Sequence, residues 1–135
     1  MDKQALLDSL DLVAERSADP APQVYARLFA RHPEMEALFV RDVTGDVRGQ
    51  MLAQAIEVLL DYVGPRAFAV NLLRTEVHNH DDMGVPGETF PAFYRAMGEA
   101  FGAIGGADWT PAMTAAWEEV AQTFGDIIAA EARSV

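Results

Sequence analysis

The sequence predicts an all-α protein built as a single domain, spanning residues 1–135. Apolar residues recur at helical spacing along nearly the whole chain, and we find neither the alternation of a β-strand nor an asparagine-glycine hairpin turn. A chain of 135 residues can bury a core without cross-links. Prolines and glycines divide it into about six or seven helical segments of unequal length, which favours an irregular helical fold over a regular four-helix bundle.

Several predicted helices have a sequence signal at one of their ends. Asp19 is the expected N-cap of the second helix, with proline in its first turn, and His32-Pro33 ends that helix because the residue before proline disfavours the helical region. Gly64-Pro65 closes the long central helix. Thr110 caps the last helix, which has proline at its first position. The predicted segments are 5–15, about 20–32, a short turn at 33–39, 47–62, 66–80 with its end near residues 81–82, 88–104 and 111 to near the C-terminus.

Composition argues against several functions. The formal net charge is −11 and the ten basic residues are scattered, whereas a nucleic-acid surface needs clustered lysine and arginine. There is no cysteine, so disulfides, thiolate metal sites and a cysteine nucleophile are excluded. The N-terminus lacks the apolar core of a signal peptide, and no run is long enough to span a bilayer. We therefore expect a soluble cytoplasmic protein without a nucleic-acid or membrane partner.

The helix predicted at 66–80 carries two of the three histidines, His78 and His80. Residues two apart point about 200° from each other on a helix, so only one of them can face the core. His80 continues the apolar side formed by Ala69, Leu73 and Val77. His78 continues a polar side formed by Asn71, Arg74 and Thr75.

A lone inward histidine is more often a hydrogen-bonded core residue than a metal ligand. A zinc site built from protein ligands alone is poorly supported, because no second histidine or carboxylate follows His80 four residues later on the same face. A cofactor that brings its own in-plane ligands needs only one protein residue. Haem is the commonest such cofactor, and histidine is its usual proximal ligand.

Four motifs, in order, resemble bacterial globins, namely single-domain haemoglobins and the haem domain of flavohaemoglobins. The segment from Val24 to Glu34, followed by Leu38-Phe39, resembles F-Y-x-x-L-F-x-x-H-P-E with L-F after it. The segment from His80 to Val85 resembles H-x-x-L-G-V. Two shorter matches are Glu88-Thr89-Phe90 and Ala116-Trp117. The similarity runs from about residue 24 to 128, and it implies a globin fold of six to seven helices around a haem pocket.

The resemblance implies haem b, iron protoporphyrin IX, with His80 as the proximal iron ligand. Phe39 is then the aromatic that packs flat on the haem, and Tyr25 is the distal hydroxyl that can donate to bound dioxygen. Leu52 is the apolar distal residue, and Arg48 holds the polar distal position one turn earlier. The residues implied to bind the cofactor are Tyr25, Phe39, Arg48, Leu52, His80, Val85 and Phe90.

The resemblance leaves alternatives at the distal side. The loop between Phe39 and Arg48 is one residue shorter than in the family, so Gly49 competes with Arg48 for the polar distal position. Arg48 is alternatively a solvated residue or a partner of a haem propionate. Tyr25 is alternatively an ordinary core tyrosine.

The proximal side departs from the family pattern. The family's tyrosine, which bonds a glutamate near the proximal histidine, is replaced by Phe90, which has no hydroxyl. The glutamate's own position falls at or near Ala132, with Glu131 beside it. We expect backbone carbonyls to be the remaining acceptors for His80, and hence a less electron-rich ligand.

Two functional hypotheses follow. The first is a haem protein that binds dioxygen, nitric oxide or carbon monoxide reversibly, or that detoxifies nitric oxide slowly. Detoxification is expected to need an external reductase, since the sequence contains no flavin or nicotinamide domain. The second is a haem-free globin-fold module that signals through protein contacts. A hydrolase is poorly supported, because there is no nucleophile motif or metal-binding pair. A homodimer is the default expectation for assembly, since two-fold pairs are the commonest oligomers.

Overall fold

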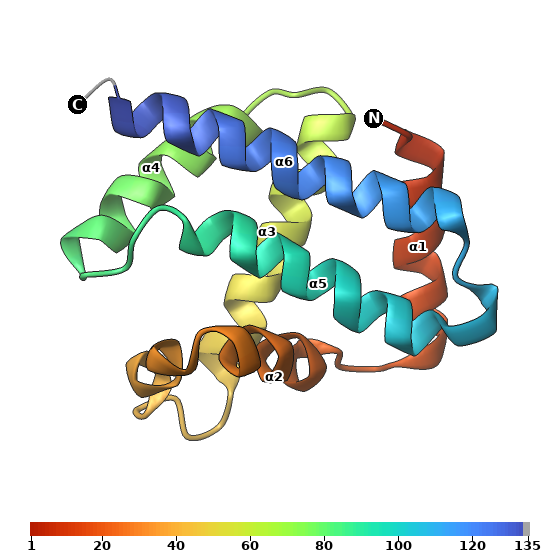
Figure 1. The fold of residues 1–135 in the computed structure, drawn as a ribbon, viewed down its shortest axis with the longest axis horizontal. Coiled ribbons are helices and arrows are strands. Elements are labelled where there is room, and N and C mark those ends of the chain that lie inside the picture. Colours follow the sequence, from red (N-terminus) through yellow and green to blue (C-terminus); the bar gives the residue numbers. More distant parts are fainter. Residues whose placement is uncertain (134–135) are drawn as a thin grey trace.

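The computed structural model describes residues 1–133, with side chains described up to residue 131, and this part of the chain is entirely helical apart from its connections. Figure 1 shows the arrangement. The elements are α1 (Lys3–Arg16), α2 (Ala21–Arg31), the 3-10 helix η1 (Pro33–Phe39), α3 (Asp46–Val63), α4 (Ala69–Asp82), α5 (Thr89–Gly105), the 3-10 helix η2 (Gly106–Asp108) and α6 (Pro111–Arg133). The predicted all-α class is confirmed.

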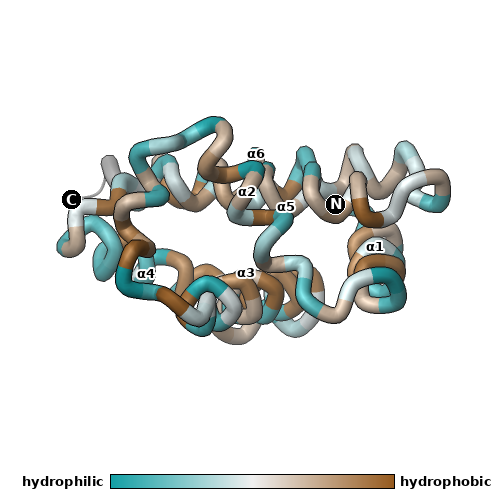
Figure 2. Tube along the Cα trace, turned by 90° about the horizontal axis from the view of Figure 1, so that it is seen from below, coloured by the Kyte–Doolittle hydropathy of each residue, from teal (hydrophilic) through white to brown (hydrophobic). Residues whose placement is uncertain are grey.

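The helices pack in two layers around one core. Helices α5 and α6 run side by side, and α1 packs against both of them. Helices α3 and α4 form the opposite layer, as the view from below shows (Figure 2). Phe101 and Phe124 lie at the centre of the core with no exposed surface. A buried hydrogen bond, 2.9 Å from Trp117 Nε1 to Ser9 Oγ, joins α6 to α1.

The loop between α3 and α4 is organised by a buried carboxylate. Asp61 accepts hydrogen bonds from the backbone N–H groups of Ala67, Phe68 and Ala69 at 3.1, 2.9 and 2.6 Å. Burial alone raises the pKa of Asp61, but these three hydrogen bonds outweigh it and lower the pKa below its ordinary value. Because the carboxylate holds residues 67–69 as a cap, α4 begins at Ala69, three residues later than predicted.

The turn after α4 brings the end of that helix next to the start of α5. The carbonyl of His80 accepts hydrogen bonds from the N–H groups of Met83 and Val85 at 3.0 and 2.8 Å. Gly84 between them has φ +84°, a conformation that residues with a side chain rarely adopt. The predicted helix end near residues 81–82 is therefore confirmed, and the turn places Val85 close to His80.

Other predicted boundaries are also confirmed. The short helix spans Pro33–Phe39 as expected, and Thr110 Oγ1 accepts from the N–H of Met113 at 3.2 Å at the start of α6.

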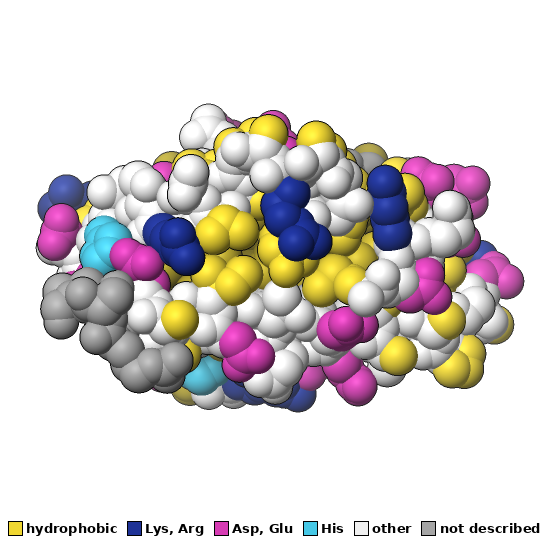
Figure 3. All heavy atoms as spheres, turned by 90° about the horizontal axis from the view of Figure 1, so that it is seen from above, with side chains coloured by type: hydrophobic (Ala, Val, Ile, Leu, Met, Phe, Trp, Pro, Cys, Tyr) yellow, Lys and Arg dark blue, Asp and Glu magenta, His cyan; other side chains and the backbone are white. Residues whose placement is uncertain are grey.

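None of the described helices combines the length and the apolar content needed to cross a membrane. On the face seen from above, acidic and basic side chains are intermixed rather than gathered into one basic patch (Figure 3).

Candidate functional site

The principal cavity lies between the two layers and has a volume of about 730 Å³. This volume falls in the range of small-molecule and cofactor sites. Helices α2, α3, α4 and α5 supply its walls, together with η1 and the loop that follows η1. Its lining is mainly apolar and includes Leu28, Met35, Phe39, Met51, Ala55, Val58, Leu73, Val85, Phe90 and Phe93.

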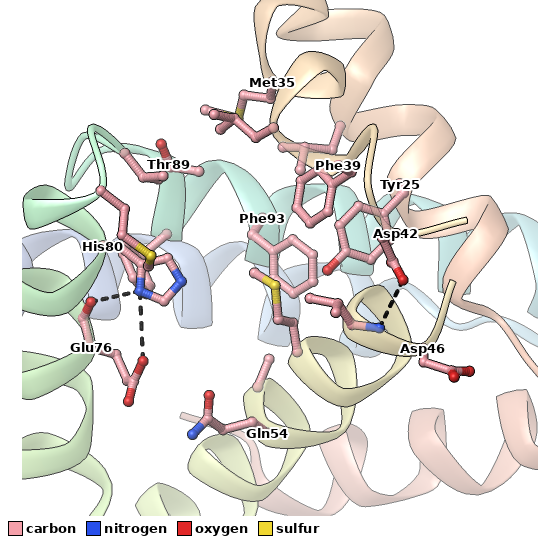
Figure 4. A pocket seen from close by; sticks show the side chains of 18 of the residues that line it. Tyr25, Met35, Phe39, Asp42, Asp46, Gln54, Glu76, His80, Thr89 and Phe93 are labelled. Carbon is pink, nitrogen blue, oxygen red and sulfur yellow. Dashed lines mark hydrogen bonds and ion pairs between the residues drawn. The ribbon is translucent and has the colours of Figure 1, made fainter. Parts of the chain in front are cut away.

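His80 projects from α4 into this cavity (Figure 4). Its Nδ1 lies 2.7 Å from the carbonyl oxygen of Glu76. A carbonyl only accepts hydrogen bonds, so Nδ1 must carry the proton, and in the neutral ring the lone pair is then on Nε2. Nε2 is the ring nitrogen that faces the cavity in Figure 4. His80 is therefore held in the tautomer that a metal ligand requires.

The orientation predicted for the two histidines of α4 is confirmed. The His80 side chain is 17% exposed, whereas that of His78 is 48% exposed and lies 2.9 Å from Glu131 Oε1. Phe90 packs edge-on against the His80 ring with centroids 5.1 Å apart. The position implied for the family's glutamate, Ala132, lies outside the described side chains.

Tyr25 faces the same cavity from α2 and is 2% exposed. Its ring contacts Phe29, Phe39 and Phe93 with centroids 5.7, 5.3 and 5.3 Å away. Burial raises the pKa of Tyr25 well above its ordinary value, and the nearby Arg48 charge offsets this only in part, so the hydroxyl stays protonated at neutral pH. That hydroxyl points into the cavity (Figure 4) and donates a long hydrogen bond, 3.3 Å, to the carbonyl of Arg48.

Two of the sequence-predicted residues do not line the cavity. Arg48 turns back over the preceding loop, with Nε 3.0 Å from Asp42 Oδ2 and Nη2 2.9 Å from the carbonyl of Asp42. Leu52 is buried in the core, 4% exposed, on a different side of α3 from the cavity. Gly49, the alternative to Arg48, is not a lining residue either.

The cavity side of α3 is shifted by one residue from the predicted register. Val47 and Met51, four residues apart, take the wall positions expected for Arg48 and Leu52, and Gln54, Ala55 and Val58 continue that side. Helical periodicity could not identify this side, because α3 is apolar on two adjacent sides. The other side, which includes Leu52 and Leu59, packs into the core.

Asp42 fixes this rotation at the start of α3. Its carboxylate accepts from the N–H groups of Val47 and Arg48 at 3.1 and 3.0 Å, and from the Arg48 side chain. Partial burial raises the pKa of Asp42, but the hydrogen bonds from Arg48 and Val47 outweigh it and lower the pKa. The cap thus holds Arg48 at the loop and leaves Val47 facing the cavity.

The cavity also contains polar groups that the sequence did not single out. The Tyr94 hydroxyl donates to the carbonyl of Ala55 at 3.0 Å. The hydroxyl oxygen of Thr89 is buried at the start of α5 without a hydrogen-bond partner in the structure. Arg41 and Glu76 lie on the cavity wall as well. Their roles depend on the cavity's shape, which sequence spacing does not describe.

Within the described residues, no group of three histidine, cysteine, aspartate or glutamate side chains could hold a metal ion. A single histidine in an apolar cavity suits a macrocyclic cofactor, which brings further metal ligands of its own.

Comparison with known families supports this interpretation. The globin family model matches residues 22–128, which include every residue named on the cavity wall. Searches among curated proteins and among solved structures returned no match. The chain belongs to the globin family, whose members generally bind haem and carry diatomic gases.

Proposed function

We propose that this globin binds haem b through His80 and uses the bound iron to bind a diatomic gas reversibly. The observation that carries the proposal is the state of His80. Its Nδ1 is committed to the carbonyl of Glu76 at 2.7 Å, and its free Nε2 faces a large apolar cavity. A histidine with one nitrogen held by the backbone and the other free is organised to bind a metal.

The cavity suits a flat, mostly apolar cofactor with polar edges. Large apolar side chains at its rim, Leu38, Val43, Val47 and Met83, are each 50% exposed or more. Exposed apolar groups gathered at one opening mark a binding surface, and a macrocycle seated there would cover them. Arg41 and the buried, unpaired hydroxyl of Thr89 are the groups we assign to the propionates.

The two sides of the cavity have different tasks in this proposal. Haem bound in the cavity would supply the iron to which the gas binds. His80 would hold that iron from α4, while the hydroxyl of Tyr25 would be the hydrogen-bond donor on the opposite side. Val47 and Met51 form an apolar distal wall that limits access of water, which slows oxidation of ferrous iron.

We propose dioxygen as the principal ligand, with nitric oxide and carbon monoxide as alternatives. Bound dioxygen carries partial negative charge, which a protonated donor such as Tyr25 stabilises. We propose binding or sensing as the main task, with nitric oxide detoxification as a slow side activity.

The test is an absorption spectrum of the purified protein, reconstituted with equimolar haemin, in the ferric, ferrous and carbonyl forms. We expect an intense Soret band that saturates at one haem per chain and shifts when carbon monoxide is added. A colourless protein that does not saturate with haemin would overturn the proposal and favour a haem-free globin module.

A further inference from the structure

A carboxylate from the cavity wall lies next to Nδ1 of His80, the ring nitrogen that does not face the cavity. Glu76 precedes His80 by one turn of α4, and its Oε2 lies 3.6 Å from His80 Nδ1. The same nitrogen donates to the carbonyl of Glu76 at 2.7 Å (Figure 4). A separation of 3.6 Å is too long for a hydrogen bond, but it is short enough for the negative charge of the carboxylate to act on the dipole of the Nδ1–H group.

The surroundings of this pair reduce screening by water. The Glu76 side chain is 25% exposed and that of His80 is 17% exposed, so neither group is fully solvated. Phe90 covers the imidazole edge-on, and the buried Leu73 and Val77 occupy the same side of α4. A carboxylate acts on its neighbour more strongly here than on an open helix surface.

The other glutamate near this helix is engaged elsewhere. Glu131 lies next to residue 132, the position to which the resemblance assigns the family's glutamate. Its carboxylate lies 2.9 Å from His78 and 3.2 Å from Arg74. Both partners lie on the polar side of α4. Glu76 is thus the carboxylate that the structure places beside Nδ1 of His80.

We propose that Glu76 is a positioning residue that tunes His80 through its Nδ1–H group. Its backbone carbonyl holds the Nδ1 proton, and its carboxylate adds negative charge beside the same N–H. The imidazole becomes a stronger electron donor to the iron, which stabilises ferric relative to ferrous iron. This inference rests on the proposed haem function. It replaces the expectation that backbone carbonyls are the remaining acceptors for His80. It also differs from the arrangement that the bacterial globins imply, in which a tyrosine bonds a glutamate near the proximal histidine.

The experiment compares the haem-loaded wild type with E76Q, E76D and the control E131Q. E76Q keeps the shape of the side chain and removes its charge, and E131Q makes the same change beside His78. The readouts are the one-electron midpoint potential and the iron–histidine stretching frequency of the ferrous, ligand-free protein. The E131Q control measures how far either readout moves when only a surface contact of α4 is lost.

For E76Q we expect a lower stretching frequency and a higher midpoint potential. The preference for ferric iron should fall about three- to tenfold. This is no larger than the smallest typical effect of removing a residue that is hydrogen-bonded to a metal ligand. Tenfold corresponds to about 59 mV for a one-electron couple. E76D, which keeps the charge, should lie closer to the wild type than E76Q, and E131Q should match the wild type.

The outcomes separate this inference from the proposed function. Wild-type values in E76Q, or equal shifts in E76D and E76Q, would overturn the role of the Glu76 charge while leaving haem binding intact. A wild type that takes up no haem would overturn the proposed function, and this inference with it.

Discussion

At the scale of single residues, His80 and His78 form a natural matched pair, because they share one helix and face opposite ways. We expect His80→Ala to abolish or severely weaken haem retention, since Nε2 faces the cavity. His78→Ala should leave the spectrum nearly unchanged, because His78 binds Glu131 at the surface. Haem transfer to an apo-globin acceptor measures retention. Retention lost in the His78 variant and kept in the His80 variant would mean that the register of α4 is wrong.

Tyr25 is predicted to slow dioxygen release. Its hydroxyl is protonated, points into the cavity and is held by a long 3.3 Å bond that can be exchanged for a ligand. Tyr25→Phe should lose a net hydrogen bond of about 0.5–1.5 kcal/mol, so dioxygen should dissociate roughly two to ten times faster. Carbon monoxide carries less charge on its outer atom and should respond less. Stopped-flow dissociation rates test this, and equal rates in both proteins would make Tyr25 a core residue only.

The corrected register of α3 gives a prediction that separates Val47 from Arg48. Val47 lines the cavity, so Val47→Gln should add a donor there and slow dioxygen dissociation roughly two- to tenfold. Arg48→Gln should leave that rate within about twofold, because its guanidinium binds Asp42 instead. Flash photolysis of both variants provides the comparison. The reverse pattern would restore Arg48 to the distal position.

At the scale of elements, Asp61 joins the end of α3 to the start of α4 by accepting three backbone hydrogen bonds. Because folding lowers the pKa of Asp61, its contribution to stability is present above the unfolded pKa of about 3.9 and is lost as pH falls through the lower, folded value. Asp61→Asn should therefore destabilise the protein at pH 7, and the difference from wild type should shrink in acid.

Urea unfolding of wild type and Asp61→Asn between pH 3 and pH 7 measures this effect. Asp11→Asn, on the exposed side of α1, is the control for loss of one charge. If the two variants lose equal stability at every pH, the carboxylate is not the cap that organises the loop.

At the scale of the whole molecule, the haem binding that we propose for the cavity predicts that cofactor binding and folding are coupled. Haem that binds only the folded state stabilises it by mass action, by about 4 kcal/mol at a free concentration near a thousand times Kd. For a chain of this size that corresponds to roughly 10 °C in Tm. We expect haemin to raise the Tm of the wild type and to have little effect on His80→Ala, as measured by circular dichroism. An equal rise in both would indicate non-specific haemin binding.

The sequence by itself determined the helical class, most helix boundaries and the inward orientation of His80. These features depend on local physics: proline and glycine end helices, and a repeat of three to four residues defines which side of α4 is apolar. The i, i+4 spacing of Glu76 and His80 is equally local. The sequence also indicated the globin family, which the match over residues 22–128 confirms.

Only the tertiary structure decided which side of α3 faces the cavity. That helix is apolar on two adjacent sides, one against the core at Leu52 and one along the cavity at Met51, so its periodicity fits both rotations. The choice was made by the cap at Asp42, which pairs with Arg48 and leaves Val47 on the wall. The start of α4 at Ala69 was likewise set by a carboxylate from the neighbouring helix, Asp61. Such contacts join separate segments, and helical periodicity describes only one segment at a time.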